Sequence, residues 1–248
     1  MIKEAIEKIV SLATPETFEI HGDSYTTNNN MKRIAPHIDQ PEAITFSSLD
    51  AIVQTLKAEV DRPEITKPVF VNVHGHDFVS VFTTLRFDNL ERDTIYEAKP
   101  ILPRPFEAWS YHDDAIITLR SRFVQNEDIE YLIGLLSRIS NDDSVTSEDN
   151  GVTQKVTAVK GVSLKTYEIP KTRVRLAPFR TFLEVEQPES EFLLRIKQGD
   201  KENNIQTQIG IIEADGGAWK LAAKHNIADY FREHLMSLIA DNKVIVTE

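Results

Sequence analysis

The sequence predicts an α+β fold, in which mainly antiparallel sheets built from hairpins carry helices packed on them. Two observations predict it. Apolar and polar residues alternate along many short segments, which turn residues separate, as in antiparallel strands. These segments are arranged as hairpins rather than as β-α-β units, which disfavours a doubly wound parallel sheet. Each half of the chain runs from hairpins to a long helix, an order that allows two similar lobes.

Helices are predicted where apolar spacing follows a capping residue. Residues 2–13 carry apolar side chains at helical spacing. LDAIVQTLKAEV follows a cap at Ser47 or Ser48, and NEDIEYLIGLLSRI begins at its cap, Asn126. NIADYFREHLMSLIA is expected to begin at Asn226, whereas DDAIITLRSRF fits either a helix or a strand.

One polar segment divides the chain. SNDDSVTSEDNG is acidic and has no apolar periodicity, which is typical of a linker. We therefore expect an N-terminal lobe over 1–140, a polar linker over 141–151, and an antiparallel sheet with a closing helix over 152–248. A single continuous domain is the alternative.

Composition limits the functions that the chain can have. With no cysteine among its 248 residues, it cannot form disulfides, thiolate metal sites or a cysteine nucleophile. The net charge of −11 disfavours binding to bulk nucleic acid, which requires a basic surface. MIKEAIEKIVSLATPE lacks the apolar core of a secretory signal, and no run of 18 apolar residues occurs. We expect a cytoplasmic protein without membrane contact.

VFVNVHGHDFVSVF is the segment with the densest metal-ligating side chains. As a hairpin with Gly75-His76 at the turn, it pairs Val73 with Phe78 and sets His74 opposite Asp77. The alternative is a metal site of His74, His76 and Asp77, which resembles the HxHxDH signature of metallo-β-lactamase-fold hydrolases. The aspartate lies one place early in that signature and the last histidine is absent, so the hairpin is favoured.

FRTFLEVEQPESEFLLRIK is predicted to be two strands joined by the loop 187–190. Glu184 and Glu186 then share one strand face, with Glu184 diagonal to Arg195. Paired carboxylates beside Arg180 and Arg195 suit acid–base chemistry or the binding of a divalent ion, and the alternative is a solvated sheet face.

Two further segments hold candidate binding residues. EADGGAW brings Glu213, Asp215 and Trp219 next to two glycines, and we predict a tight hairpin there. Trp109, in PFEAWSY, can stack on a base if exposed or belong to the core if buried. Neither phosphate-cradling glycine loops nor a GxSxG nucleophile motif occurs, so we expect no cofactor and lean away from an enzyme.

RLAPFRTFLEVEQPESEFLLRI and IGIIEADGGAWKLAA resemble an uncharacterised family from tailed phages and prophages, the YfdQ-like proteins, and residues 174–222 carry the resemblance. The resemblance includes an arginine-bearing strand, an EVEQP turn and an EADGG-W hairpin. Phe179 stands where the family has tyrosine, and Leu183 where it has proline. The family lends no activity. It implies a phage- or prophage-encoded protein that acts in the host cytoplasm.

Three functions are compatible with the sequence. The first is a non-enzymatic accessory protein that binds a host or phage protein or a small signalling nucleotide, in host takeover or counter-defence. The second is a metal-dependent hydrolase or nuclease, and the third is a self-assembling phage component. For the first of these functions we expect a homo-oligomer. Its candidate binding residues are Trp109, Arg180, Glu184, Glu186, Arg195, Glu213, Asp215 and Trp219.

Overall fold

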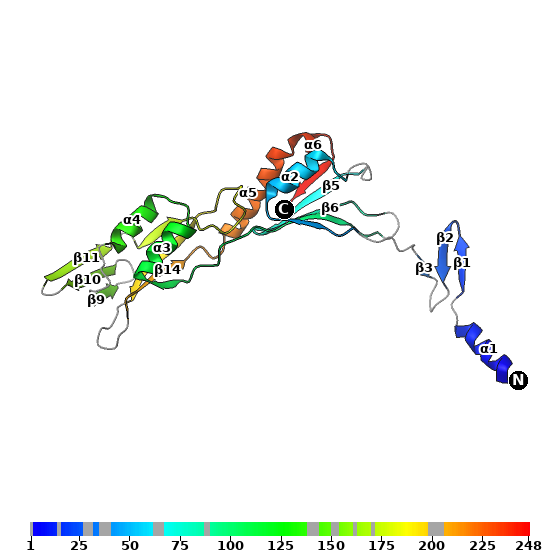
Figure 1. The fold of residues 1–248 in the computed structure, drawn as a ribbon, viewed down its shortest axis with the longest axis horizontal. Helices are drawn as coiled ribbons and strands as arrows, with labels where there is room; N and C mark the ends of the chain where they lie inside the picture. Colours follow the sequence, from blue (N-terminus) through cyan, green and yellow to red (C-terminus); the bar gives the residue numbers. More distant parts are fainter. Residues whose placement is uncertain are drawn as a thin grey trace.

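The computed structural model confirms the predicted α+β class, with helices packed on a mixed sheet and on an antiparallel sheet (Figure 1). The structure describes residues 2–13, 16–26, 32–34, 41–61, 67–86, 90–137, 144–149, 154–160, 163–169, 172–197 and 206–248. No helix in these ranges is both long and apolar enough to cross a bilayer.

The mixed sheet has five strands in the order β15-β5-β6-β7-β4, with the outer pairs β15–β5 and β4–β7 parallel. Three helices, α2, α5 and α6, pack with it and complete what we call the mixed-sheet lobe (Figure 1). Its elements are β4 (Ile44–Phe46), α2 (Leu49–Ala58), β5 (Val69–Gly75), β6 (Phe78–Phe82), β7 (Thr94–Ala98), α5 (Trp219–His234), α6 (Met236–Ala240) and β15 (Val244–Thr247).

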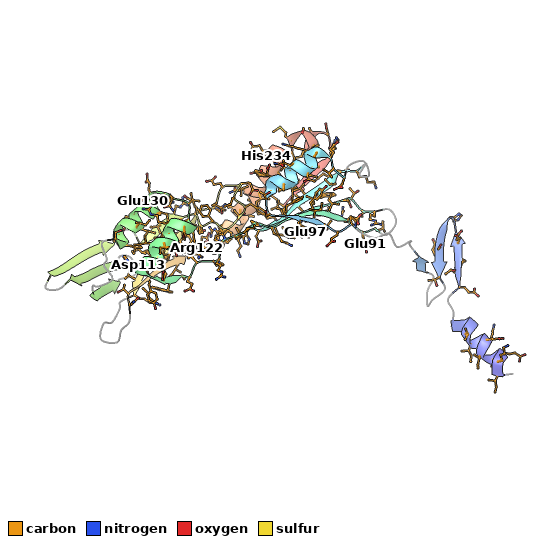
Figure 2. All side chains as sticks on the ribbon, in the orientation of Figure 1. Glu91, Glu97, Asp113, Arg122, Glu130 and His234 are labelled. Carbon is orange, nitrogen blue, oxygen red and sulfur yellow. The ribbon has the colours of Figure 1, made fainter. Side chains whose placement is uncertain are left out.

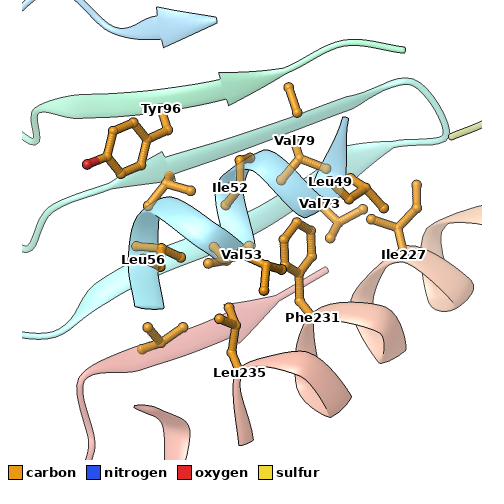
Figure 3. Close-up of a cluster of buried hydrophobic side chains, with 14 of the residues drawn as sticks. Leu49, Ile52, Val53, Leu56, Val73, Val79, Tyr96, Ile227, Phe231 and Leu235 are labelled. Carbon is orange, nitrogen blue, oxygen red and sulfur yellow. The ribbon is translucent and has the colours of Figure 1, made fainter. Parts of the chain in front are cut away.

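A cluster of buried apolar side chains fills the space between these helices and the sheet (Figure 3). Ile52 of α2 and Phe231 of α5 are fully buried in it, opposite Val73 and Val79 of the hairpin strands. Burying each such side chain contributes about 1.5–3 kcal/mol, so α5 is integral to this lobe although it comes late in the chain.

The second sheet is antiparallel, with the order β12-β13-β14-β8. Two helices, α3 and α4, pack on it, and we call this unit the antiparallel-sheet lobe (Figure 1). Its elements are β8 (Trp109–Tyr111), α3 (His112–Arg122), α4 (Glu127–Leu136), β12 (Arg173–Leu176), β13 (Ser190–Lys197) and β14 (Gln208–Glu213). The segment DDAIITLRSRF, for which the sequence allowed either a helix or a strand, is therefore helical.

The remaining described elements are a helix and two three-stranded antiparallel sheets. Figure 1 shows α1 and the first of these sheets apart from both lobes. They are α1 (Ile2–Ala13), β1 (Thr17–Ile20), β2 (Asp23–Thr26), β3 (Lys32–Ile34), β9 (Ser144–Asp149), β10 (Gln154–Lys160) and β11 (Ser163–Ile169). Strand β9 lies inside the segment 141–151 that the composition indicates as a linker.

The two buried clusters do not follow the predicted division of the chain at 141–151. The cluster of the mixed-sheet lobe combines residues of 49–98 with Phe182 and residues of 227–244. The cluster of the antiparallel-sheet lobe combines residues of 115–136 with residues of 174–211. Each lobe is thus built from both halves of the chain.

The helix caps are as predicted at two positions. The Ser48 side chain accepts a hydrogen bond from the Ala51 N–H, and the Asn126 side chain accepts one from the Ile129 N–H. Asn226 is not a cap, because α5 already begins at Trp219 and Asn226 lies within it.

The hairpin over Val69–Phe82 is confirmed, but its predicted register is wrong by one residue. Val73 pairs with Val79 rather than with Phe78, and the register shifts at His74 because Gly75 pairs with Phe78. The turn therefore falls on His76 and Asp77. At this irregularity His74 is an extra residue of β5 without a partner in β6, which alternation alone does not reveal.

The strand predicted at the start of 179–197 is wrong. Strand β12 ends at Leu176, and the chain then runs without a strand until Ser190. Phe182 is fully buried and Leu183 is 72% exposed. Glu184 and Glu186 therefore do not share a strand face, and Glu184 instead accepts a hydrogen bond from the N–H of Leu49 at 2.8 Å.

The hairpin predicted at Asp215-Gly216-Gly217 is wrong as well, because strand β14 turns directly into α5. Both glycines have positive φ, at 66° and 85°, as the sequence led us to expect of the turn. The Asp215 carboxylate accepts hydrogen bonds from the N–H groups of Gly217 and Trp219, at 2.9 and 3.3 Å. It thereby satisfies amide groups where the helix begins.

Candidate functional site

Four of the predicted binding residues, Arg180, Glu213, Asp215 and Trp219, meet where the two lobes join. The Arg180 guanidinium lies over the Trp219 ring, with its carbon 3.9 Å from the ring centroid. It also forms an ion pair with Glu213 and donates to the carbonyl of Pro188 at 2.9 Å. The side chain is only 12% exposed. Charge-assisted hydrogen bonds and the aromatic face thus hold one buried cation in a fixed orientation.

Asp215 supports this cation indirectly. Its carboxylate accepts from the Ser190 hydroxyl at 2.5 Å, and Ser190 in turn accepts from Arg180. Burial raises the pKa of Asp215, but hydrogen bonds from Ser190, Gly217 and Trp219 and the charge of Arg180 outweigh it, so the pKa lies below its ordinary value. Asp215 is therefore an anion that fixes both the helix start and the arginine.

Burial lowers the pKa of Arg180, while Glu213 and Asp215 counteract that shift. Arginine still remains a cation in proteins. Its Nε is buried and finds no hydrogen-bond acceptor within the described part of the chain. Buried donors are rarely left unpaired, and an acceptor from a ligand or a water molecule would satisfy this one.

A loop organised by one buried glutamine presents Arg180. Gln187, 6% exposed, accepts from the N–H groups of Arg180 and Thr181 at 2.9 and 3.2 Å. Its amide nitrogen donates to the carbonyls of Phe182 and Val185. The Thr181 hydroxyl donates to the carbonyl of His76 at 2.6 Å, which ties the loop to the β5–β6 turn.

His76, predicted as an alternative metal ligand, belongs to this site in another role. Its ring meets the Trp219 ring edge-on, with 4.7 Å between centroids. Burial lowers the pKa of His76, as do the charges of Lys220 and Arg180, while Asp77 opposes them. The imidazole is therefore held toward its neutral form at neutral pH.

His74 contacts other residues than His76 does. Its Nε2 lies 2.7 Å from the Ser80 hydroxyl, and its ring stacks on Phe78 at 4.7 Å. Across the described ranges, no group of three or more histidine, aspartate or glutamate side chains is placed to hold a metal ion.

A cavity of about 420 Å³, which we call the junction pocket, opens beside Arg180 and Trp219. Its ionisable lining comprises four cations and the imidazole of His76 against a single carboxylate, Glu213. The cations are Arg104, Arg122, Arg180 and Lys220. The apolar lining comprises Leu102, Pro103, Pro105, Phe106, Pro178, Phe179 and Trp219. Such a volume, with apolar walls and a few convergent charges, is typical of a site for a small ligand.

Three of the cations are available for a ligand. Among the described residues, no carboxylate forms an ion pair with Arg104, Arg122 or Lys220, although Arg122 donates to the carbonyl of Arg104. Figure 2 shows that α3 runs from Asp113 to Arg122 toward the other lobe. In a chain of net charge −11, this concentration of positive charge makes the pocket attractive to anions.

The other predicted binding residues lie outside the junction pocket. Trp109 is on β8, packed over Gly210 and under the Lys197 ammonium, which is 3.7 Å from the ring centroid. Arg195 lies on β13, where its Nη1 donates to the carbonyl of Leu194. The Glu186 carbonyl accepts from the Asn226 side chain. Neither these residues nor Glu184 lines the cavity.

Sequence reasoning missed Arg104, Arg122 and Lys220. Two of them lie beside features that the sequence does show, since Arg104 is in the proline-rich run PILPRPF and Lys220 directly follows Trp219.

Neither a family model, nor a curated protein, nor a solved structure matches this chain.

Proposed function

We propose that the protein acts by binding rather than by catalysis, and that its junction pocket binds a small nucleotide. The observation that carries the proposal is the set of five basic side chains around one cavity with a single carboxylate. Phosphate groups are the anions that arginine recognises through paired hydrogen bonds. The flat apolar walls of proline, phenylalanine and tryptophan suit the less polar part of the same ligand.

The resemblance of residues 174–222 to tailed-phage proteins supports a biological context for this proposal. Capture of a host signalling nucleotide by a phage-encoded accessory protein is a form of host takeover or counter-defence. The residues quoted for that resemblance include Arg180, Glu213 and Trp219, which line the junction pocket, and Asp215, which supports Arg180 through Ser190.

Calorimetric titration with a panel of nucleotides, including cyclic mononucleotides and dinucleotides, tests the proposal. We expect at least one to bind with micromolar affinity that weakens as salt is added. Lys220→Glu and Arg104→Glu should each weaken binding about tenfold or more, because a ligand hydrogen bond to a charged group contributes about 1.5–3 kcal/mol.

Lys67→Glu is the matched control, since Lys67 is exposed and lies outside the pocket. It makes the same charge change and should leave affinity within about twofold. If every nucleotide fails to bind to folded protein, or if the control weakens binding as much as the pocket variants, the proposal is wrong.

Self-association is a second candidate function, and α1 is the observation that favours it. Ile2, Ile6 and Ile9 of this helix are 79%, 55% and 65% exposed, at the spacing of a coiled-coil seam. A 12-residue helix is marginal alone in water, so pairing with α1 of another copy would stabilise it. We expect solution mass measurements to show a multimer that Ile6→Lys dissociates, whereas Glu7→Lys leaves it intact.

A further inference from the structure

A second cavity adjoins the junction pocket. It measures about 620 Å³ and lies between α3, β8 and the loop that contains Arg104. We call it the α3 pocket. It shares Arg104, Pro105, Phe106 and Arg122 with the junction pocket, so these four residues border both cavities. A ligand held by the two arginines therefore has room on either side of them.

The two cavities differ in charge. The α3 pocket sets the carboxylates of Glu107 and Asp114 against the two shared arginines, so its charges balance, whereas the junction pocket is cationic. Neutral hydrogen-bonding groups complete the polar lining of the α3 pocket, namely Ser110, Thr118, Ser121 and Gln208. A phosphate is thus favoured in the junction pocket, and a neutral group that donates hydrogen bonds is favoured in the α3 pocket.

The α3 pocket also offers an aromatic surface. Tyr111 is 48% exposed, and no hydrogen bond of its hydroxyl is recorded among the described residues. Trp109 forms a fixed part of the wall, because Gly210 lets its ring lie against β14 and Lys197 covers it. Bases stack on such exposed rings with a contribution that alanine substitution removes.

We infer that the two pockets hold one nucleotide, with its phosphate in the junction pocket and an amino-bearing base in the α3 pocket, against Tyr111 and beside Asp114. This inference rests on the proposed function and adds the chemical class of the base that the bound nucleotide carries. Carboxylates accept hydrogen bonds from the amino groups of bases, as glutamate and aspartate do from cytosine. Adenine, guanine and cytosine carry that group, and uracil lacks it.

The test compares AMP, GMP, CMP, UMP and ribose 5-phosphate by calorimetry on the intact chain. We expect at least one amino-bearing nucleotide to bind about tenfold or more tightly than both UMP and ribose 5-phosphate. Asp114→Asn should remove most of the advantage over UMP, and Tyr111→Ala should remove most of the advantage over ribose 5-phosphate. Neither variant should change the affinity for ribose 5-phosphate itself. Lys220→Glu should instead weaken all five ligands together.

Asp113→Asn is the matched control, because Asp113 lies next to Asp114, is 75% exposed and does not line the pocket. The Asp113→Asn variant should keep the preference for amino-bearing nucleotides over UMP. Tyr111 is the N-cap residue of α3 without a side-chain capping bond, so its replacement leaves the helix start intact. Equal affinity for ribose 5-phosphate and every nucleotide would overturn the inference alone. Failure of all five to bind would also overturn the inference, and the proposed function falls with it only if the cyclic nucleotides and the dinucleotides fail to bind as well.

Discussion

His76 is the residue through which pH should act on the junction pocket. Burial, Lys220 and Arg180 keep its pKa below the ordinary value, and Asp77 opposes them. A bound phosphate beside the ring would favour the imidazolium and raise that pKa. Binding then takes up a proton, so affinity should increase as the pH falls through the range between the free and the bound pKa.

We therefore expect cyclic AMP to bind about three- to tenfold more tightly at pH about 5.5 than at pH about 7.5. A phosphodiester is the suitable probe because it keeps its charge over this range, whereas a phosphomonoester titrates near pH 6. Calorimetry at several pH values measures the effect. His76→Gln should flatten the profile, and an unchanged slope in that variant would exclude His76 as the titrating group.

Gly210 is the residue that positions Trp109. A Cβ at this position would lie 2.7, 2.8 and 3.0 Å from three carbons of the rigid indole ring. Gly210→Ala should therefore displace the ring and destabilise the protein by about 1–3 kcal/mol. Denaturant unfolding measures the stability, and fluorescence in a Trp219→Phe background reports on Trp109, the other tryptophan.

The control for this change is Gly134→Ala in α4, where the added Cβ meets nothing within 4 Å. Replacing a helical glycine with alanine there should stabilise the protein by about 0.5–1 kcal/mol. If both substitutions shift stability in the same direction, the close contact with Trp109 is not what determines the choice of glycine at 210.

At the scale of elements, the loop between β12 and β13 depends on Gln187. Its side chain occupies four backbone groups of the loop, two N–H groups and two carbonyls. The Phe182 carbonyl also accepts from the Val185 N–H, so Gln187→Leu would leave three of those groups unpaired. Each buried unpaired group costs about 1–3 kcal/mol. We expect a loss of at least about 2 kcal/mol in unfolding free energy, together with weaker nucleotide binding, because the loop presents Arg180.

Glu189→Gln is the control for this loop, since Glu189 is exposed. It should change the stability by less than about 0.5 kcal/mol. Denaturant unfolding and calorimetry on both variants separate the two effects. Wild-type stability of Gln187→Leu would show that the glutamine does not organise the loop.

The elements that the sequence predicted correctly are those with local signals. The caps Ser48 and Asn126 mark two helix starts, and alternation marks the hairpin at 69–82. Alternation failed over 179–186, where Gln187 takes over the backbone hydrogen bonds that a partner strand would supply. The glycines 216 and 217 were recognised as a turn, but positive φ suits both a hairpin and a strand-to-helix turn.

The candidate site was predictable only in part, for a reason that lies at the scale of the whole molecule. Glu213, Asp215 and Trp219 are close in sequence, and Arg180, 33 residues before Glu213, lies in another segment that the sequence singled out. Arg104 comes from the proline-rich loop, Arg122 from the end of α3, and the imidazole of His76 from the β5–β6 turn. Only the packing of the lobes brings them to one cavity, and no local pattern encodes that.

The same interleaving of segments predicts how the molecule folds. The buried cluster of the mixed-sheet lobe needs Ile227, Phe231 and Val244 from the end of the chain as well as the strands at 69–98. A fragment 1–140 lacks those side chains, each of which contributes about 1.5–3 kcal/mol on burial. It also leaves the edge of β5 without its parallel partner β15.

We therefore expect that neither fragment 1–140 nor fragment 152–248 unfolds cooperatively on its own, whereas the two together recover a cooperative transition followed by circular dichroism. The chain 41–248 is the control, because it keeps every buried residue of both clusters and should unfold cooperatively by itself. A sharp transition in isolated 1–140 would show that the N-terminal half carries a sufficient core and that the division of the chain at 141–151 is a true domain boundary.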